Sequence, residues 1–285
     1  MTNGKSQSQS GIPSGLHVVA TPIGNLRDIT LRALDTLQEC DRLLAEDTRR
    51  TGKLLEAHGL SAKMVSYHDH NAGARVPQVL EWLAAGERIA LVSDAGTPLV
   101  SDPGFRLVRA ARKAGHAVHA VPGASAVVAA LSVAGLPSDQ FHFAGFLPPK
   151  RGARRTALRE LAGVPGTLVF YETGPRLADM LGDCAEVLGD REARVARELT
   201  KTFEEVRMGS LSELAAMETP KGEIVVLVAP GAPEEWSDRD VDAALSQRSG
   251  LSVKDAAKEV AELSGRPKRE LYARAQSLRD GQNGG

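Results

Sequence analysis

The sequence predicts an α/β protein of two domains, with a mainly parallel sheet in the N-terminal domain and a small helical module at the C-terminus. Three observations lead to this prediction. Short β-rich runs alternate with helical patterns from Leu16 onward, which is typical of parallel strands joined by helices. The chain has 285 residues, more than one compact domain usually holds. Two further helical patterns, separated by a turn at Gly265, end the chain.

The N-terminal domain is expected over residues 15–134, after a disordered leader of residues 1–14 that is rich in Ser, Gln and Gly. Leucines at positions 31, 34, 37, 43 and 44 fall on one face of a helix predicted over residues 28–44. The other elements predicted in this domain are strands at residues 16–20, 89–93 and 117–121 and helices at residues 105–114 and 124–134.

A change to Pro, Gly and Phe around residues 135–150 indicates a connection to a second α/β domain, expected over residues 135–230. Its predicted elements are strands at residues 167–171, 194–197 and 223–229 and a helix at residues 176–188. An acidic, Pro-containing segment follows, which we interpret as a linker over residues 231–250. A helix-turn-helix-like module is expected over residues 251–285.

Composition narrows the function classes. The formal net charge is −1, so any contact with a nucleic acid must come from local patches. Only two cysteines occur, Cys40 and Cys184, without metal-ligand spacing, which argues against a disulfide framework and fits a reducing compartment. No apolar run approaches the roughly 20 residues that span a membrane, so no membrane association is expected.

Three Gly/Pro-rich segments directly follow predicted strands, at residues 20–26, 93–98 and 122–126. In open α/β sheets, ligands bind at the carboxyl ends of the strands, and glycine lets the backbone approach a ligand closely. Asp94 could accept hydrogen bonds from a ribose or an ammonium group. None of the segments reads G-x-G-x-x-G or Walker A, so the usual sequence support for dinucleotide or nucleoside triphosphate binding is missing.

Five runs together resemble the 16S ribosomal RNA cytidine 2′-O-methyltransferases, the small-subunit methyltransferase I family of the tetrapyrrole methylase superfamily. They lie at residues 19–30, 46–49, 93–104, 170–172 and 197–201, and the resemblance covers residues 16–280. It implies a tetrapyrrole-methylase fold with S-adenosylmethionine in the cleft between the two α/β domains. It also implies a cytoplasmic homodimer that acts on 16S ribosomal RNA or on the assembled small subunit.

By position, the resemblance implies a cofactor site made of Ile23, Asp94, Ala95, Gly96, Thr97, Ser125 and Ala126. The chain departs from the family pattern twice. Residues 170–176 read Phe-Tyr-Glu-Thr-Gly-Pro-Arg and lack the histidine that the family often has there, so that histidine is no essential base in this chain. Ala124 stands where the third loop usually has proline.

A ribose hydroxyl is a poor nucleophile, so its methylation requires a positioned oxygen and favours a nearby base. The predicted catalytic residues are Asp47, Arg49, Glu172 and His68. Asp47 and Arg49 could instead form a solvated helix end, and Glu172 could form a salt bridge at the domain interface. His68 could contact RNA or accept a proton. The pair His68 and His70 lacks further ligands, and methyl transfer from a sulfonium needs no metal, so no metal is expected.

Basic residues concentrate between residues 147 and 159, where five positive charges occur without an acid. This run and the start of the last predicted helix are expected to contact RNA phosphates through Lys150, Arg151, Arg154, Arg155, Arg266, Lys268 and Arg269. Tyr272 would pack or stack on a base. The alternatives are a solvated surface for the first group and a packing appendage for the second.

Two other functions compete with ribose methylation. An enzyme of the same fold could methylate a tetrapyrrole or a protein side chain, but such relatives more often begin with G-x-G-x-G, where this chain has Thr21 to Gly24. A non-catalytic RNA-binding module for ribosome assembly is disfavoured by the near-neutral charge and by the three cofactor-type loops.

Overall fold

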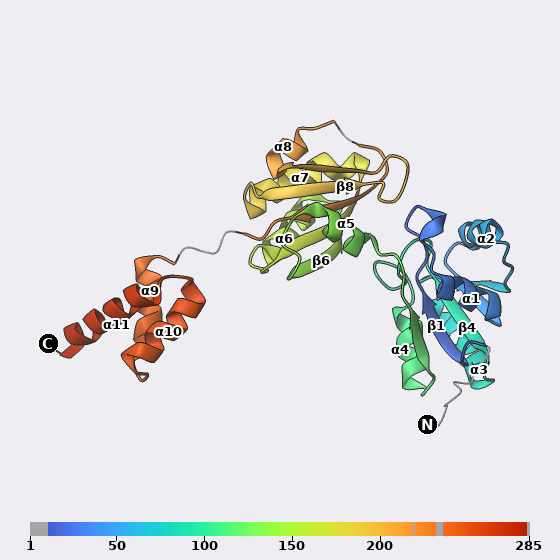
Figure 1. Cartoon of the computed structure of the whole chain (residues 1–285), viewed down its shortest axis with the longest axis horizontal. Helices are drawn as coiled ribbons and strands as arrows, with labels where there is room; N and C mark the ends of the chain where they lie inside the picture. The colour runs from blue at the N-terminus through green and yellow to red at the C-terminus, as the bar shows by residue number, and fades with distance from the viewer. Residues whose placement is uncertain (1–10, 219, 232–235, 284–285) are drawn as a thin grey trace, which may run out of the picture. The chain divides into compact units, whose positions relative to one another are not determined.

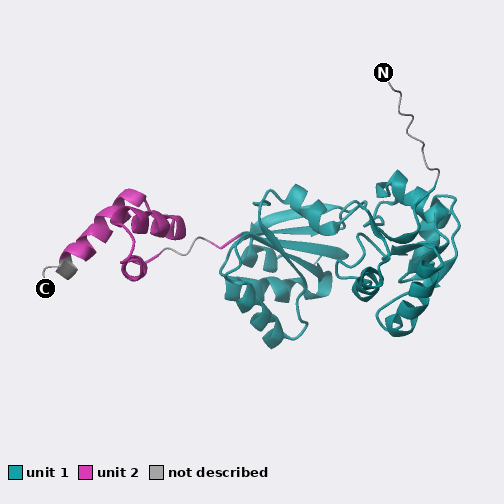
Figure 2. Ribbon diagram, turned by 90° about the horizontal axis from the view of Figure 1, so that it is seen from below, with its two compact units in different colours: residues 1–229 teal, residues 230–285 magenta. Residues whose placement is uncertain are grey.

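The computed structural model describes residues 11–218, 220–231 and 236–283, and the chain divides between Ala229 and Pro230 into two compact units (Figure 2). Residues 1–10 of the predicted leader lie outside the described residues. Within residues 11–14, the backbone N–H of Ile12 donates to the Glu39 carboxylate at 2.8 Å.

The first half of the larger unit is built on a fully parallel five-stranded sheet (Figure 1). In spatial order its strands are β3 (Met64–Ser66), β2 (Arg42–Ala45), β4 (Arg88–Val92), β1 (Gly15–Val19) and β5 (Val118–Val121). Its helices are α1 (Leu31–Glu39), α2 (Thr48–Ala57), α3 (Ala72–Ala84) and α4 (Phe105–Lys113), with a short 3₁₀ helix at Leu26–Asp28. The prediction of a mainly parallel N-terminal sheet is therefore confirmed.

The helix predicted over residues 28–44 is wrong in its second half. Helix α1 ends at Glu39, Cys40 has extended backbone angles, and Leu43 and Leu44 lie in strand β2. The two leucines pack into different hydrophobic clusters on opposite faces of the sheet. A strand that is buried on both faces has a continuous apolar run. Such a run also fits the period of a helix, so periodicity alone does not distinguish the two.

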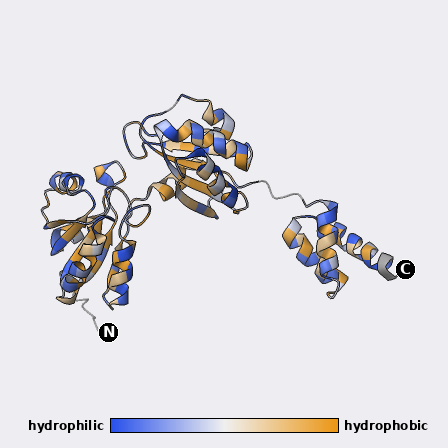
Figure 3. Ribbon diagram, turned by 180° about the vertical axis from the view of Figure 1, so that it is seen from behind, coloured by the Kyte–Doolittle hydropathy of each residue, from blue (hydrophilic) through white to orange (hydrophobic). Residues whose placement is uncertain are grey.

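The second half of this unit contains a mixed sheet in the order β6 (Phe141–Phe146), β7 (Thr167–Thr173), β10 (Glu223–Val228), β8 (Glu192–Arg197) and β9 (Glu205–Ser210). Only β6 and β7 pair in parallel. One face packs against α6 (Arg151–Leu161), α7 (Gly174–Leu188) and α8 (Leu211–Ala215), with the thiol of Cys184 inside this core. Hydropathy colouring shows the strands of both sheets as largely hydrophobic (Figure 3).

Helix α5 (Ala126–Ala134) covers the other face of the second sheet, although the predicted boundary placed it in the N-terminal domain of residues 15–134. Its Val127, Ala130 and Leu131 pack with Val169 and Val225 of the sheet. Helix α5 therefore follows the last strand of the first sheet in the chain but packs against the second sheet.

The smaller unit is a bundle of three helices, α9 (Asp238–Gln247), α10 (Val253–Ser264) and α11 (Lys268–Asn283). Two helices were predicted, and α9 lies inside the segment interpreted as a linker over residues 231–250. Val241 and Leu245 of α9 are buried with Val260 and Leu271, so this helix completes the core that a pair alone would leave open. Within the part of the chain that the structure describes, no helix is long and apolar enough to cross a membrane.

Candidate active site

Three loops that follow β1, β4 and β5 are joined into one wall. These strands are parallel neighbours, so their carboxyl ends lie at the same edge of the sheet. Thr21 and Gly96 exchange backbone hydrogen bonds of 2.9 and 3.1 Å between the first and second loops. The hydroxyl of Thr97 donates to the carbonyl of Ala124 in the third loop at 3.1 Å. The predicted loops therefore come together as expected.

The first loop also touches the second half of the unit at Gly24. A methyl group on Gly24 would lie 2.5 Å from Cγ of Lys201 and 2.9 Å from the carbonyl oxygen of Leu199, closer than such atoms approach. The next residue, Asn25, donates its backbone N–H to the hydroxyl of Thr200 at 3.0 Å. Glycine at position 24 is thus required for the contact that joins the two halves beside the loops.

A cavity of about 310 Å³ lies between the three loops and the second sheet. This volume is within the usual range of small-molecule sites. Six of the seven residues predicted to bind the cofactor line it: Ile23, Ala95, Gly96, Thr97, Ser125 and Ala126. The second half contributes Phe146, Tyr171, Glu172, Thr173, Ala196, Leu199, Glu223, Ile224 and Val225. The lining is mostly small or apolar.

The charged residues that line the cavity are all carboxylates, Asp102, Glu172 and Glu223. Glu172 is 2% exposed; its Oε1 accepts the backbone N–H of Thr173 at 2.8 Å and lies 3.2 Å from Nε of Arg176. Its Oε2 is buried without a hydrogen-bond partner among the described residues. Glu223 pairs with Lys201 at 2.9 Å, so Asp102 is the carboxylate of the lining that has no ion pair among the described residues and can receive a cationic group of a ligand.

Asp102 was missed as a site residue, although it lies in the run 93–104. Burial raises the pKa of its carboxyl to about 6, the charge of Glu46 adds to the shift, and a hydrogen bond with Ser93 opposes it. Two residues shortly before it in the chain, Leu99 and Ser101, have left-handed backbone angles with φ of 74° and 62°. Such angles are strained for residues other than glycine and concentrate at functional sites.

Asp94, the seventh residue predicted to bind the cofactor, does not line the cavity. Its Oδ1 accepts the backbone N–H of Asp47 at 3.0 Å, and its Oδ2 lies 3.5 Å from Arg50. Asp94 thus fastens the second loop to the start of α2.

Of the four predicted catalytic residues, only Glu172 lines the cavity. Asp47 caps α2 by accepting the backbone N–H of Arg49 at 2.9 Å, and the two side chains form an ion pair of 2.8 Å. Hydrogen bonds from Arg49 hold the pKa of Asp47 well below its usual range, which makes that carboxylate a weak base. His68 is held by Asn71, whose side chain contacts its Nε2 at 3.3 Å. The described residues contain no group of three metal-binding side chains.

The basic run at the start of α6 is not free of acids in space. Nε of Arg154 donates to Asp183 of α7 at 2.7 Å, and Nε of Arg155 and of Arg151 lie 2.8 and 3.2 Å from the same carboxylate. Arg154 is 4% exposed, so the prediction that it contacts RNA is wrong. The neutralising acid lies about thirty positions further along the chain, beyond any local charge pattern. Lys150 is exposed and has no ion-pair partner in the described part of the chain.

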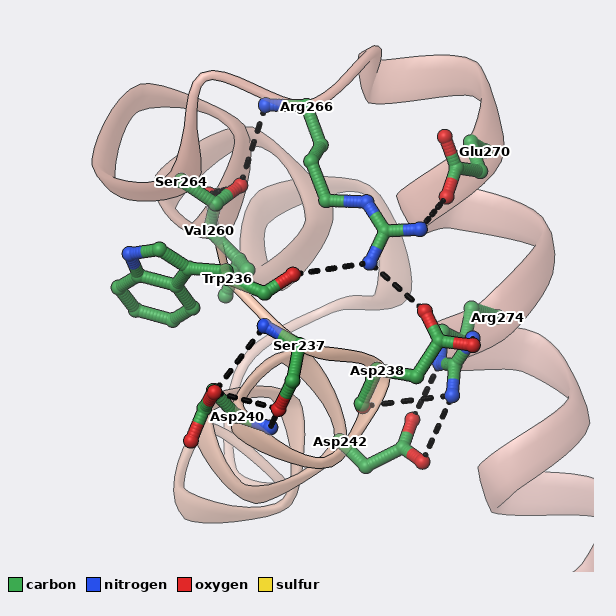
Figure 4. A network of polar contacts seen from close by, with 10 residues as sticks. All are labelled: Trp236, Ser237, Asp238, Asp240, Asp242, Val260, Ser264, Arg266, Glu270 and Arg274. Atoms are coloured by element: carbon green, nitrogen blue, oxygen red, sulfur yellow. Dashed lines mark hydrogen bonds and ion pairs between the residues drawn. The ribbon is translucent and has the colours of Figure 1, made fainter. Parts of the chain in front are cut away.

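In the smaller unit, the predicted RNA-contacting residue Arg266 is held in a network of polar contacts (Figure 4). Its guanidinium lies 2.8 Å from Asp238 of α9 and pairs with Glu270 of α11. Arg274 joins the same network through Asp238 at 3.0 Å. Arg266 therefore ties α9 to α11. Lys268 and Arg269 are exposed and form no ion pair within the described ranges.

Two family models match the chain. Residues 15–215 match the Tetrapyrrole (Corrin/Porphyrin) Methylases, and residues 237–279 match the RsmI C-terminal HTH domain. The ribosomal RNA small subunit methyltransferase I of Mesorhizobium japonicum is 50% identical over 93% of this chain and 92% of that protein. The protein of the same name from Escherichia coli O157:H7 is 46% identical, over 93% and 96%.

Solved structures agree in fold. The uroporphyrin-III C-methyl transferase from Thermus thermophilus complexed with S-adenyl homocysteine superposes with a TM-score of 0.54 at 20% identity. The match covers 75% of this chain and 97% of that one. At this identity, the likeness extends to the fold alone.

Proposed function

The chain belongs to the ribosomal RNA small subunit methyltransferase I family of the tetrapyrrole methylases, and we propose that it methylates the 2′-hydroxyl of a cytidine in 16S ribosomal RNA. The methyl donor is S-adenosylmethionine, in keeping with a relative of the same fold that was solved with S-adenyl homocysteine. The ribose position and the cytidine identity are inferred from the sequence resemblance.

The observation that carries the proposal is the chemistry of the cavity. Its walls are small or apolar, which suits an adenine ring, and its charged side chains are acidic. S-adenosylmethionine carries a positive sulfonium and a positive ammonium group. Asp102 is partly buried, and a partly buried carboxylate attracts such charges more strongly than one surrounded by water. The unpartnered Oε2 of Glu172 is the kind of buried polar atom that a ligand is expected to satisfy.

The sulfonium supplies an electrophilic methyl group when the cofactor is bound. The residues of this chain then have three tasks. The joined loops around Gly96 and Thr97 orient the cofactor and exclude water from one side. Asp102 holds a positive group of the cofactor. Glu172 accepts the proton of the ribose hydroxyl, because this residue lines the cavity and its Oε2 has no hydrogen-bond partner among the described residues. Bringing the hydroxyl into line supplies much of the rate enhancement.

RNA is held outside the cavity by exposed cations. Lys150 and Arg151 at the start of α6 lie on the same chain segment as Phe146 of the cavity lining, and Arg49 is 88% exposed at the start of α2. In the smaller unit, Lys268 and Arg269 are exposed at the start of α11 together with Tyr272. These side chains are suited to contact phosphates and a base without touching the methyl group.

We further propose that the enzyme acts as a homodimer in the cytoplasm, where its ribosomal RNA substrate is made. Strand β9 is the edge of its sheet and exposes Met208, which is 70% exposed, and the preceding loop exposes Phe203. An exposed edge with large apolar side chains is a surface that proteins usually cover. Light scattering on the purified chain measures its mass directly, and a value of one subunit would refute the dimer.

The test of the function is mass spectrometry of 16S ribosomal RNA from a strain without this gene. One 2′-O-methylcytidine should be missing, and the wild-type gene should restore it. The Glu172→Gln variant, which cannot accept the proton, should restore it poorly, whereas Glu186→Gln, an exposed carboxylate of α7, should restore it fully. Unchanged ribose methylation in the deletion strain would refute the proposal.

A further inference from the structure

An aromatic ring stands partly exposed at the cavity. Phe146 is 53% exposed, yet it lines the cavity together with Ser101 and Asp102. Exposed hydrophobic residues are common on protein surfaces, but a phenylalanine that belongs to a ligand cavity leaves one ring face available to what binds there.

The position of this ring depends on a β-bulge in strand β6. In a regular strand, residues 143 and 146 would point to opposite faces of the sheet. The register against β7 shifts between Phe143 and Gly145, and both rings consequently contact Tyr171, with centroids 4.8 and 5.6 Å from its ring. Bulges re-aim side chains next to active sites. The irregular strand thus places Phe146 at the cavity.

Two further features fix the bulge in place. Gly145 has a left-handed backbone with φ of 66°, which favours glycine, and a methyl group there would lie 3.3 Å from Oγ of Ser101. Tyr171 meets Phe146 edge-on at an interplanar angle of 63°, a favourable aromatic geometry. The ring is therefore held before any ligand arrives, which reduces the entropy that binding would cost.

An exposed lysine, Lys150, follows Phe146 in the chain. Lys150 follows four residues later, is exposed, and forms no ion pair in the part of the chain that the structure describes. Four residues extend at most about 14 Å, so the Cα atoms of Phe146 and Lys150 lie within about 14 Å of each other. Aromatic rings for bases beside cations for phosphates are the usual means of holding single-stranded RNA.

We propose that Phe146 stacks on the base of the acceptor nucleotide, while the ribose of that nucleotide enters the cavity and Lys150 contacts a neighbouring phosphate. This inference rests on the proposed function, because it requires a ribonucleotide acceptor. The base of the acceptor nucleotide fits beside Phe146, because it is bonded to the same ribose that carries the reacting hydroxyl. The cavity has further apolar lining at Ala196 and Val225 that suits the adenine of the cofactor.

The first experiment compares variants at this position. Phe146→Leu removes the aromatic face but keeps an apolar side chain, and Phe146→Tyr keeps the face. Phe141→Leu is the matched control, because Phe141 is 46% exposed on the same strand but outside the cavity lining. The probe is a 16S fragment with the target cytidine, bound in the presence of S-adenosylhomocysteine so that no turnover occurs.

Loss of one stacked base typically weakens binding about 5- to 150-fold. We expect Phe146→Leu to raise the Kd for the fragment by at least about fivefold, and Phe146→Tyr and Phe141→Leu to leave it within about twofold. The Kd for S-adenosylmethionine should be unchanged in all three. Weaker cofactor binding by Phe146→Leu would mean that the ring contacts adenine, and it would overturn the inference.

The second experiment removes the base instead of the ring. A fragment with an abasic target nucleotide should bind wild type more weakly, and Phe146→Leu should add no further loss, because ring and base lose the same contact. Additive losses would overturn the inference. Failure of the proposed function has a different signature, since wild type would then methylate no small-subunit RNA at all.

Discussion

Asp183 and Asp102, two carboxylates of the larger unit, have opposite surroundings. Asp183 of α7 is 3% exposed and lies among three arginines of α6; burial alone would raise its pKa, but hydrogen bonds from these arginines outweigh burial and hold the pKa below its usual value. Asp102 lines the cavity and forms no ion pair within the described residues, and burial raises its pKa to about 6. The paired carboxylate joins two helices, whereas the unpaired one is free to receive a charge from outside.

Removing the paired charge should have the largest effect. Asp183→Asn leaves the buried guanidinium of Arg154 without its counter-charge, which typically costs about 3–5 kcal/mol of the free energy of unfolding. Urea denaturation measures this loss. The control is Glu186→Gln, because Glu186 pairs with Arg151 and Arg155 but not with the buried Arg154, and its side chain is 56% exposed. This change should cost less than about 1 kcal/mol. Equal losses in the two variants would mean that burial does not distinguish these pairs.

Removing the unpaired charge should instead affect the ligand. Asp102→Asn should weaken S-adenosylmethionine binding about 10- to 150-fold, the equivalent of about 1.5–3 kcal/mol for a hydrogen bond to a charged group, without lowering stability. Isothermal titration calorimetry measures the affinity and thermal unfolding the stability. Asp94→Asn is the matched control, since Asp94 belongs to the same loop but does not line the cavity. An equal or larger loss of affinity in Asp94→Asn would restore the sequence-based assignment of Asp94.

The same contrast predicts a pH dependence. Asp102 must be ionised to hold a cation, so S-adenosylmethionine should bind more weakly as the pH falls from 7 through about 6. Stability should move in the opposite direction: a raised carboxyl pKa contributes stability below the unfolded value near 4, and this contribution is lost as the pH rises through about 6. Calorimetry between pH 5 and 7 should show the pH dependence of both binding and stability in the wild type. The Asp102→Asn variant should show neither.

The smallest effects on RNA affinity are expected in the smaller unit, where Lys268 and Arg269 form no ion pair among the described residues and Arg266 does. Replacing Lys268 and Arg269 by Ala should lower the slope of log affinity against log salt by about 0.7–0.9 for each phosphate contact. Arg266→Ala should leave that slope unchanged and lower the melting temperature, because Arg266 is engaged with Asp238 and Glu270. RNA titrations at several salt concentrations test both statements. A reduced slope in Arg266→Ala would show that its network opens to bind RNA.

The parts of the fold that follow local patterns could be predicted from the sequence. Strands β1, β4 and β5 were expected from their β-rich runs, and the three loops behind them contain six residues of the cavity lining. The predicted helix extends over strand β2, because Leu43 and Leu44 also fit the 3.6-residue period of the leucines before them. The segment that contains α9 is acidic and contains proline, which predicts a linker. Its few apolar residues form a core only with α10 and α11.

Contacts between distant positions could not be predicted. The run from Lys150 to Arg159 contains no acid, and Asp183, which neutralises three of its arginines, comes from the next helix. Asp102 gave no signal beyond its loop, because its environment depends on Glu46 and on the second sheet. The exposure of Phe146 depends on a register shift against β7 that no period in the sequence reveals.

The two cysteines have a practical consequence for labelling. Burial raises the pKa of the Cys184 thiol to about 12 and that of the Cys40 thiol to about 11. At neutral pH both are almost fully protonated, and the protonated form reacts slowly with maleimides. A single cysteine introduced at an exposed position, such as Glu160→Cys on α6, should therefore accept a fluorophore selectively while both native cysteines remain. Such a probe, on the same helix as the basic run, would report RNA docking in an otherwise unaltered chain.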